Sequence, residues 1–226
     1  MIYLSYEDYA LYRRCPYAYH LKSLHPETGP TERERTKEIF NRTVTDTFHG
    51  GIPVGLATFQ RLTKESGLSR EHLIRLIAAV NLAVPIFAEI KAESTGKVFC
   101  RSAGDVVLSM PVPAIITDIH GNVTLAWRHG SRGLAAGELS KATYHTALIA
   151  VTGVASVRVL QFVGVGRGSH RIESEAVRTP KDLDQFVEDV IQTGNLIVTE
   201  TFPKAPLDDF RCSLEHCRYW SICRGA

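Results

Sequence analysis

The sequence predicts an α/β fold in which a helical N-terminal lobe precedes a mixed sheet flanked by helices. Three observations favour this class: a helical apolar periodicity before residue 95, a run of short strand patterns after it, and alternating helix and strand patterns further on. The chain has 226 residues, of which 44% are apolar, enough for a real core. We expect a single domain, 1–226, made of a helical lobe (1–95), a core (96–200) and a tail (201–226).

Helical patterns fill the predicted lobe. Ser5 and Asp8 are spaced as a capping box, and the helix that they begin should be kinked at Pro16. Gly50-Gly51 should end the second helix, and Ser69 should cap the second piece of the third region. The expected helical regions are 6–24, 31–49 and 56–91.

Strand patterns dominate the predicted core. Thr179 and Pro180 have the spacing of an N-cap and a first helical residue, so a helix should run from there to about Asn195. Another helix is expected over 138–151. The predicted strands are 97–110, 112–119, 122–127, 155–163 and 171–177.

Composition sets broad limits on function and location. The net charge of +2 and the pI of about 8.3 are too mild to indicate nucleic-acid binding by themselves. There is no run of eighteen apolar residues, and the N-terminus lacks a basic segment followed by an apolar one, so neither a membrane span nor a secretory signal is expected. Five cysteines make an odd number, which disfavours a disulfide framework. We expect a cytoplasmic protein, or a virion component if a virus encodes it.

Four of the five cysteines lie near the two ends of the chain. Cys15 follows a pair of arginines, whereas Cys212, Cys217 and Cys223 form a Cys-x4-Cys-x5-Cys tail. Four thiolates at one point would join the termini and build a sulfur cage typical of a 4Fe–4S cluster. Zn²⁺ is the alternative, although structural zinc sites usually have two short knuckles rather than one distant ligand. We therefore expect a 4Fe–4S cluster held by these four cysteines.

The segment around Cys15 also indicates a family. The sequence Tyr-Arg-Arg-Cys-Pro-Tyr-Ala-Tyr at 12–19, after Leu-Ser-Tyr at 4–6, resembles the N-terminal motif of RecB-like PD-(D/E)XK nucleases with iron–sulfur clusters. These include the CRISPR adaptation exonucleases and AddB-type nuclease domains, in which one cysteine precedes the core and three follow it. The resemblance implies a PD-(D/E)XK, restriction-endonuclease-like core, an iron–sulfur tail and DNA as the partner.

The catalytic positions depart from the pattern of that family. Its nucleases hold a divalent metal with an aspartate and with an acidic residue two places before a lysine on the next strand. Here Ala126 stands at the acidic position and Arg128 at the lysine position, while the aspartate should fall near Ala114 or Ile115. None of the apolar residues can bind metal. The resemblance therefore favours a degenerate nuclease over an active enzyme.

A displaced metal site is the alternative. Asp118 ends a predicted strand, and Glu138 and Lys141 lie one turn apart on a predicted helix. These three residues could bind Mg²⁺ or Mn²⁺ in an active enzyme. The competing interpretation is a surface ion pair formed by Glu138 and Lys141, with Asp118 as a turn residue.

Basic residues near tyrosines suggest where DNA could bind. Tyrosines alternate with cations around Cys15, an arrangement typical of single-stranded nucleic-acid binding through charge and stacking. In the competing interpretation the tyrosines pack inside the lobe and the arginines face solvent. The charge run at 32–35 is expected to be a solvated helix face. The candidate DNA contacts are Arg13, Arg14, Lys22, Arg128, Tyr144 and Arg167.

These patterns are compatible with three functions. The first is a non-catalytic protein with a nuclease fold that binds DNA or serves as a subunit of a nucleoprotein assembly, with other protein subunits as partners. The second is an active metal-dependent DNA exonuclease with the displaced site. The third is a purely architectural component of a viral particle or another multi-subunit complex.

Overall fold

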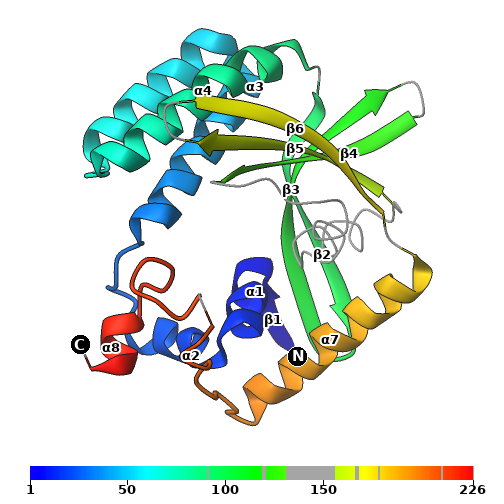
Figure 1. Cartoon of the computed structure of the whole chain (residues 1–226). Helices are drawn as coiled ribbons and strands as arrows, with labels where there is room; N and C mark the ends of the chain where they lie inside the picture. Colours follow the sequence, from blue (N-terminus) through cyan, green and yellow to red (C-terminus); the bar gives the residue numbers. More distant parts are fainter. Residues whose placement is uncertain are drawn as a thin grey trace.

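The computed structural model describes residues 1–90, 92–118, 121–130, 156–165, 168–177, 179–209 and 211–225. Their architecture is mixed α/β, as predicted, with helices on a six-stranded sheet (Figure 1). The helices are α1 (Tyr6–Arg14), α2 (Pro16–Leu24), α3 (Glu32–Glu65), α4 (Arg70–Glu89), α7 (Pro180–Val198) and α8 (Trp220–Arg224). The strands are β1 (Ile2–Ser5), β2 (Ala92–Ala103), β3 (Val106–Asp118), β4 (Gly121–Gly130), β5 (Ser156–Val165) and β6 (Gly168–Val177).

The sheet contains both parallel and antiparallel pairs. Its order is β1-β3-β4-β5-β6, and β2 also pairs with β3. The β1/β3 and β4/β5 pairs are parallel, and the β2/β3, β3/β4 and β5/β6 pairs are antiparallel. The strand predicted over 97–110 is wrong, because the chain reverses at Gly104, whose φ of 57° suits glycine far better than other residues. β1 was not predicted, since four residues carry too little periodicity. The helix predicted over 138–151 lies outside the described residues.

The break between α1 and α2 places Cys15 at a corner. Cys15 has an extended backbone (φ −158°, ψ 101°), and Pro16 begins α2, where its missing N–H costs nothing. The Ser5 side chain accepts a hydrogen bond from the backbone N–H of Asp8 at 3.1 Å, so the predicted start of α1 is confirmed. The kink predicted at Pro16 is confirmed as a full break between two helices.

The glycine pair at 50–51 separates two helical segments of α3, so the helix end predicted there is confirmed. Gly51 has a non-helical φ of 75°, and a second helical segment continues beyond it to Glu65. Further along, a Cβ on Gly55 would lie 2.0 Å from the hydroxyl oxygen of Thr47, so only glycine fits against the first half of the helix. The kink therefore turns the second half of α3 to run beside α4 (Figure 1).

The larger core lies where α3 and α4 cover β5. The rings of Phe40, Phe87 and Phe162 are completely buried there, with centroids 5.5 and 5.6 Å apart across the helix–sheet interface. α4 is, within the described residues, the helix whose length and composition would allow it to cross a membrane. A core helix passes the same test, and Leu76, Val80 and Phe87 of α4 are buried in this cluster.

A second core forms where α1 and α7 pack against β1 and β3. The ring of Tyr9 on α1 meets Phe186 on α7 edge to face, with centroids 5.6 Å apart. Burial raises the pKa of Tyr9 to about 12. α7 also approaches β3 closely at Gly194, where a Cβ would lie 2.2 Å from a methyl carbon of Val106.

We expect the substitution Gly194→Ala to destabilise the protein by about 1–3 kcal/mol, since the added methyl group must push α7 away from β3. Urea unfolding would measure the change. Gly29→Ala is the matched control, because a Cβ there meets nothing within 4 Å. Equal stability of the two variants would contradict the close packing of α7 on β3.

Candidate functional site

The C-terminal tail docks on the N-terminal helices and brings the two ends of the chain together. Tyr219 is 3% exposed and packs with Ala18 and Leu21 of α2. The Tyr12 hydroxyl donates to the carbonyl of Thr201 at 2.6 Å. These contacts span almost two hundred residues of sequence, so the tail closes a loop that contains most of the chain.

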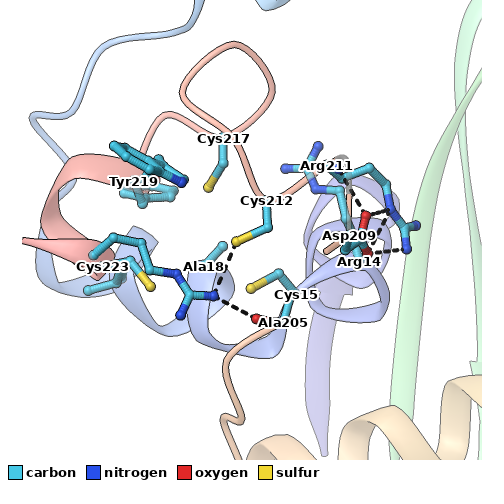
Figure 2. Close-up of a pocket in the computed structure, with 13 residues that line it drawn as sticks. Arg14, Cys15, Ala18, Ala205, Asp209, Arg211, Cys212, Cys217, Tyr219 and Cys223 are labelled. Carbon is cyan, nitrogen blue, oxygen red and sulfur yellow. Dashed lines mark hydrogen bonds and ion pairs between the residues drawn. The ribbon is translucent and has the colours of Figure 1, made fainter. Parts of the chain in front are cut away.

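A pocket lies at this junction, and four cysteines from three segments line it (Figure 2). Cys15 comes from the corner between α1 and α2, Cys212 and Cys217 come from the tail loop, and Cys223 comes from α8. All four are free thiols, and Figure 2 shows their sulfur atoms facing a common space. The structure therefore brings together the four cysteines that the sequence singled out.

The pocket does not, however, form the expected metal centre. Across the described residues, no group of three or more His, Cys, Asp or Glu side chains is placed to hold a metal ion. The prediction of a metal-binding, iron–sulfur centre is therefore wrong for this arrangement of side chains, and the four residues form a thiol pocket instead.

Assays of iron and acid-labile sulfide on freshly purified protein test the correction directly, and stoichiometric iron would overturn it.

Burial and hydrogen bonding act on two sulfur atoms of the thiol pocket. Burial raises the pKa of the Cys217 thiol. The Arg224 guanidinium donates to the Cys212 sulfur at 3.2 Å and, through the same nitrogen, to the carbonyl of Ala205 at 2.6 Å (Figure 2). The hydrogen bond to Cys212 raises the pKa of Arg224. The Cys212 sulfur is thus held by a side chain of the same tail.

Ion pairs fix the tail around the pocket. Arg211 donates to both carboxylate oxygens of Asp209 and lowers the pKa of that carboxyl group to about 2. Arg218 donates to Glu34 of α3 at 3.0 and 3.1 Å. Desolvation alone would raise the pKa of Glu34, but the hydrogen bonds from Arg218 and Thr31 outweigh it and lower the pKa.

The tyrosines of α1 are part of the protein interior. Tyr6, Tyr9 and Tyr12 are 8% exposed or less, and the Tyr12 ring packs edge to face against Tyr19 at 5.6 Å. A buried ring has no free face on which a base could stack. The stacking role that the sequence suggested for these three tyrosines is therefore wrong, and the competing interpretation, in which they pack inside the lobe, is confirmed.

The predicted DNA contacts lie in different surroundings. Arg13 pairs with Asp189 at 3.3 Å, and Lys22 pairs with Asp8 at 2.5 Å. The hydrogen bond from Lys22 to Asp8 raises the pKa of Lys22. Arg14 lines the thiol pocket and has no side-chain hydrogen bond or ion pair in the described part of the chain. Tyr144 and Arg167 lie outside the described residues, as does the side chain of Arg128.

The charge run at the start of α3 is not simply a solvated face. Glu32 accepts hydrogen bonds from the backbone and hydroxyl of Ser69, which lower its pKa. Arg35 donates to the carbonyl of Pro30. With Glu34 held by Arg218, Arg33 is the member of the run that is left without a side-chain partner among the described residues.

Lys37 lies one turn after Arg33 and is a residue that the sequence did not single out. Its side chain is exposed to solvent, and desolvation by neighbouring residues lowers its pKa. The nearby charges of Arg14 and Arg33 lower the pKa further, while those of Glu7 and Glu34 oppose this. One lysine among many gives no signal in the sequence, because only the fold determines its neighbours.

The strand register places the residues that the family resemblance singled out on β3 and β4. Ala114 of β3 pairs with Leu125 of β4, and Ala126 is the residue that follows Leu125. Ala126 and Arg128 are two residues apart on β4. Asp118 pairs with Gly121 at the far end of the same hairpin. Glu138 and Lys141 lie outside the described residues, so the displaced site stays a prediction.

Comparisons with known proteins bear on the fold. No family model matches the chain, and no curated protein matches it. The structure is similar to the crystal structure of SSO0001, with a TM-score of 0.51 and 12% sequence identity over 99% of this chain and 86% of the other. At this identity the similarity shows a shared fold and nothing further.

We expect attachment of the tail to weaken in acid. The folded-state pKa of Glu34 is lowered, so its stabilising effect is complete above the unfolded-state pKa of about 4.3 and disappears as the pH falls through the folded value. Digestion with pepsin at a series of pH values should show cleavage of the tail rising as the pH decreases. The variant Glu34→Gln should lose most of this dependence, and identical profiles for the two proteins would contradict it.

Proposed function

We propose that this protein binds DNA on a PD-(D/E)XK-like scaffold without cleaving it, and that it acts as a subunit of a nucleoprotein assembly. The proposal joins the family resemblance of the N-terminal segment to the mixed α/β fold of the described residues. It requires no chemistry from the thiol pocket, which lies where the two ends of the chain meet.

The proposal depends mainly on which residues occupy the positions where nucleases of this family bind metal. β3 and β4 form an antiparallel pair, which suits a catalytic hairpin, but Ala114, Ile115 and Ala126 occupy the acidic positions. The aliphatic side chains of alanine and isoleucine supply no oxygen to a hard cation. A scaffold that keeps the strands and lacks the carboxylates supports binding rather than hydrolysis.

Cations without partners support DNA as the ligand. Duplex and single-stranded DNA both present a dense row of phosphates, and proteins bind them largely through arginine and lysine. Arg14, Arg33 and Lys37 make no side-chain ion pair within the described residues, whereas Arg13, Lys22, Arg211 and Arg218 do.

The proposal predicts DNA binding without DNA shortening. In the presence of Mn²⁺, a labelled single strand and a labelled duplex should both keep their length, while fluorescence anisotropy should show binding that weakens steeply as salt rises, as expected for phosphate contacts. Shortening of either DNA that is abolished by Glu138→Ala would support the exonuclease alternative with Asp118, Glu138 and Lys141 as its metal site. A protein that neither binds nor cleaves DNA would leave the architectural alternative.

A further inference from the structure

We infer that Cys212 is a thiol that reacts with hydrogen peroxide, and that its oxidation leads to a disulfide bond with Cys15. The bond would join the C-terminal tail covalently to the corner between α1 and α2. The inference concerns the thiol pocket alone and does not depend on DNA binding, so it and the proposed function can fail separately.

The thiol pocket gathers four sulfur atoms around a very small space. Four free and partly exposed cysteines line it, namely Cys15, Cys212, Cys217 and Cys223. The cavity volume is about 20 Å³, which is room for about one water molecule. Figure 2 shows the sulfur atoms pointing into this space, so a sulfur atom that becomes oxidised there has other thiols in the same pocket.

Cys212 differs from the other three cysteines in what surrounds its sulfur atom. The Arg224 guanidinium donates a hydrogen bond to that sulfur at 3.2 Å. The other three cysteines instead pack against the apolar cluster that Tyr219 forms with α2. A neighbouring cation favours the thiolate, which is the nucleophilic form of cysteine, whereas apolar surroundings favour the thiol. Cys212 is therefore the sulfur of this pocket that is best prepared to attack an oxidant.

The size of the cavity selects the oxidant. Hydrogen peroxide is little larger than water, so it fits where a peptide disulfide such as oxidised glutathione does not. The Cys212 thiolate attacks one oxygen of the peroxide, an S–O bond forms and the O–O bond breaks. The second oxygen leaves as hydroxide and takes up a proton to become water. The product at Cys212 is a sulfenic acid.

The disulfide forms in a second step. The Cys15 thiolate attacks the Cys212 sulfur, an S–S bond forms and the S–O bond breaks. The hydroxyl group leaves as water with the proton that the Cys15 thiol released. Two thiols thus lose two electrons to one peroxide molecule, which becomes two molecules of water.

The backbone around each cysteine favours Cys15 as the partner of Cys212. Cys15 lies between two helices on an extended backbone, which can adjust as the bond forms. Cys223 is inside α8, where the helix restricts such movement. Burial raises the pKa of the Cys217 thiol and so disfavours it as the attacking group.

The inference is tested by treating the whole reduced chain with hydrogen peroxide, alkylating the remaining thiols and mapping the digested peptides by mass spectrometry. We expect a peptide pair joined between Cys15 and Cys212, lighter than the two separate peptides by the mass of two hydrogen atoms. Dithiothreitol should restore both thiols. Glutathione disulfide at the same concentration should leave Cys212 unmodified.

Two results of this mapping would overturn the inference. A disulfide confined to the tail would exclude Cys15 as the partner, and a glutathione adduct on Cys212 would exclude selection of a small hydroperoxide by the cavity. Stoichiometric iron in the purified protein would overturn it as well, because coordinated sulfur atoms cannot form the bond.

Variants test the order of the steps. Cys212→Ser should abolish the disulfide, and Cys15→Ser should stop at the sulfenic acid, which dimedone captures. Arg224→Gln should slow the reaction about threefold to tenfold, since the thiolate fraction falls by more than the nucleophilicity of each thiolate rises. Arg224→Lys keeps the cation and should recover most of the rate. An Arg224→Gln variant that reacts as fast as the unaltered protein would overturn the role of this arginine.

The matched control is Cys100→Ser, since Cys100 lies on β2 and is the fifth cysteine of the chain rather than one of the four that line the thiol pocket. This variant should form the disulfide at the rate of the unaltered protein. Equal oxidation of Cys100 and Cys212 in the unaltered protein would overturn the assignment of a prepared site. Circular dichroism of each variant separates loss of the reaction from loss of the fold.

Discussion

Docking of the C-terminal tail on α2 is the interaction on which the arrangement of the terminal segments depends. Tyr219 is buried against Ala18 and Leu21, and the hydroxyl of Tyr12 binds the backbone at Thr201. Both contacts join residues that are far apart in sequence. Closing so long a loop costs entropy, which burial of Tyr219 and the surrounding hydrogen bonds must offset. The thiol pocket exists because of this closure.

Charge compensation determines which basic residues of the terminal helices are available to a ligand. Arg13 and Lys22 lie beside carboxylates of the same chain, so their charges are already balanced before any partner approaches. Arg33 differs because its acidic neighbours in sequence are turned toward Ser69 and Arg218 instead.

Much of the secondary structure could be predicted from local patterns. The break at Cys15-Pro16, the cap at Ser5 and the start of α7 after Thr179 depend on a few adjacent residues, so spacing was sufficient to locate them. The reversal at Gly104 was missed because a single glycine inside an apolar run resembles an irregular strand. Gly50-Gly51 was located correctly as a helix end, because the non-helical φ of Gly51 separates two helical segments there. Local sequence indicates where a backbone can bend, and packing decides how the segments on either side of the bend lie, as at Gly55 against Thr47.

The sequence by itself determined the mixed α/β class, the absence of carboxylates at the expected positions on β3 and β4, and the four cysteines that meet at one pocket. These features depend on residue identity, periodicity and spacing, which are local properties. Only the tertiary structure decided that the tyrosines of α1 are buried, that the side chains of the described residues form no metal site at the four sulfur atoms, and that Glu34 is paired with Arg218 of the tail. The reason is that burial, ligand geometry and electrostatic coupling depend on distances between segments remote in sequence, and a linear pattern contains no such distances.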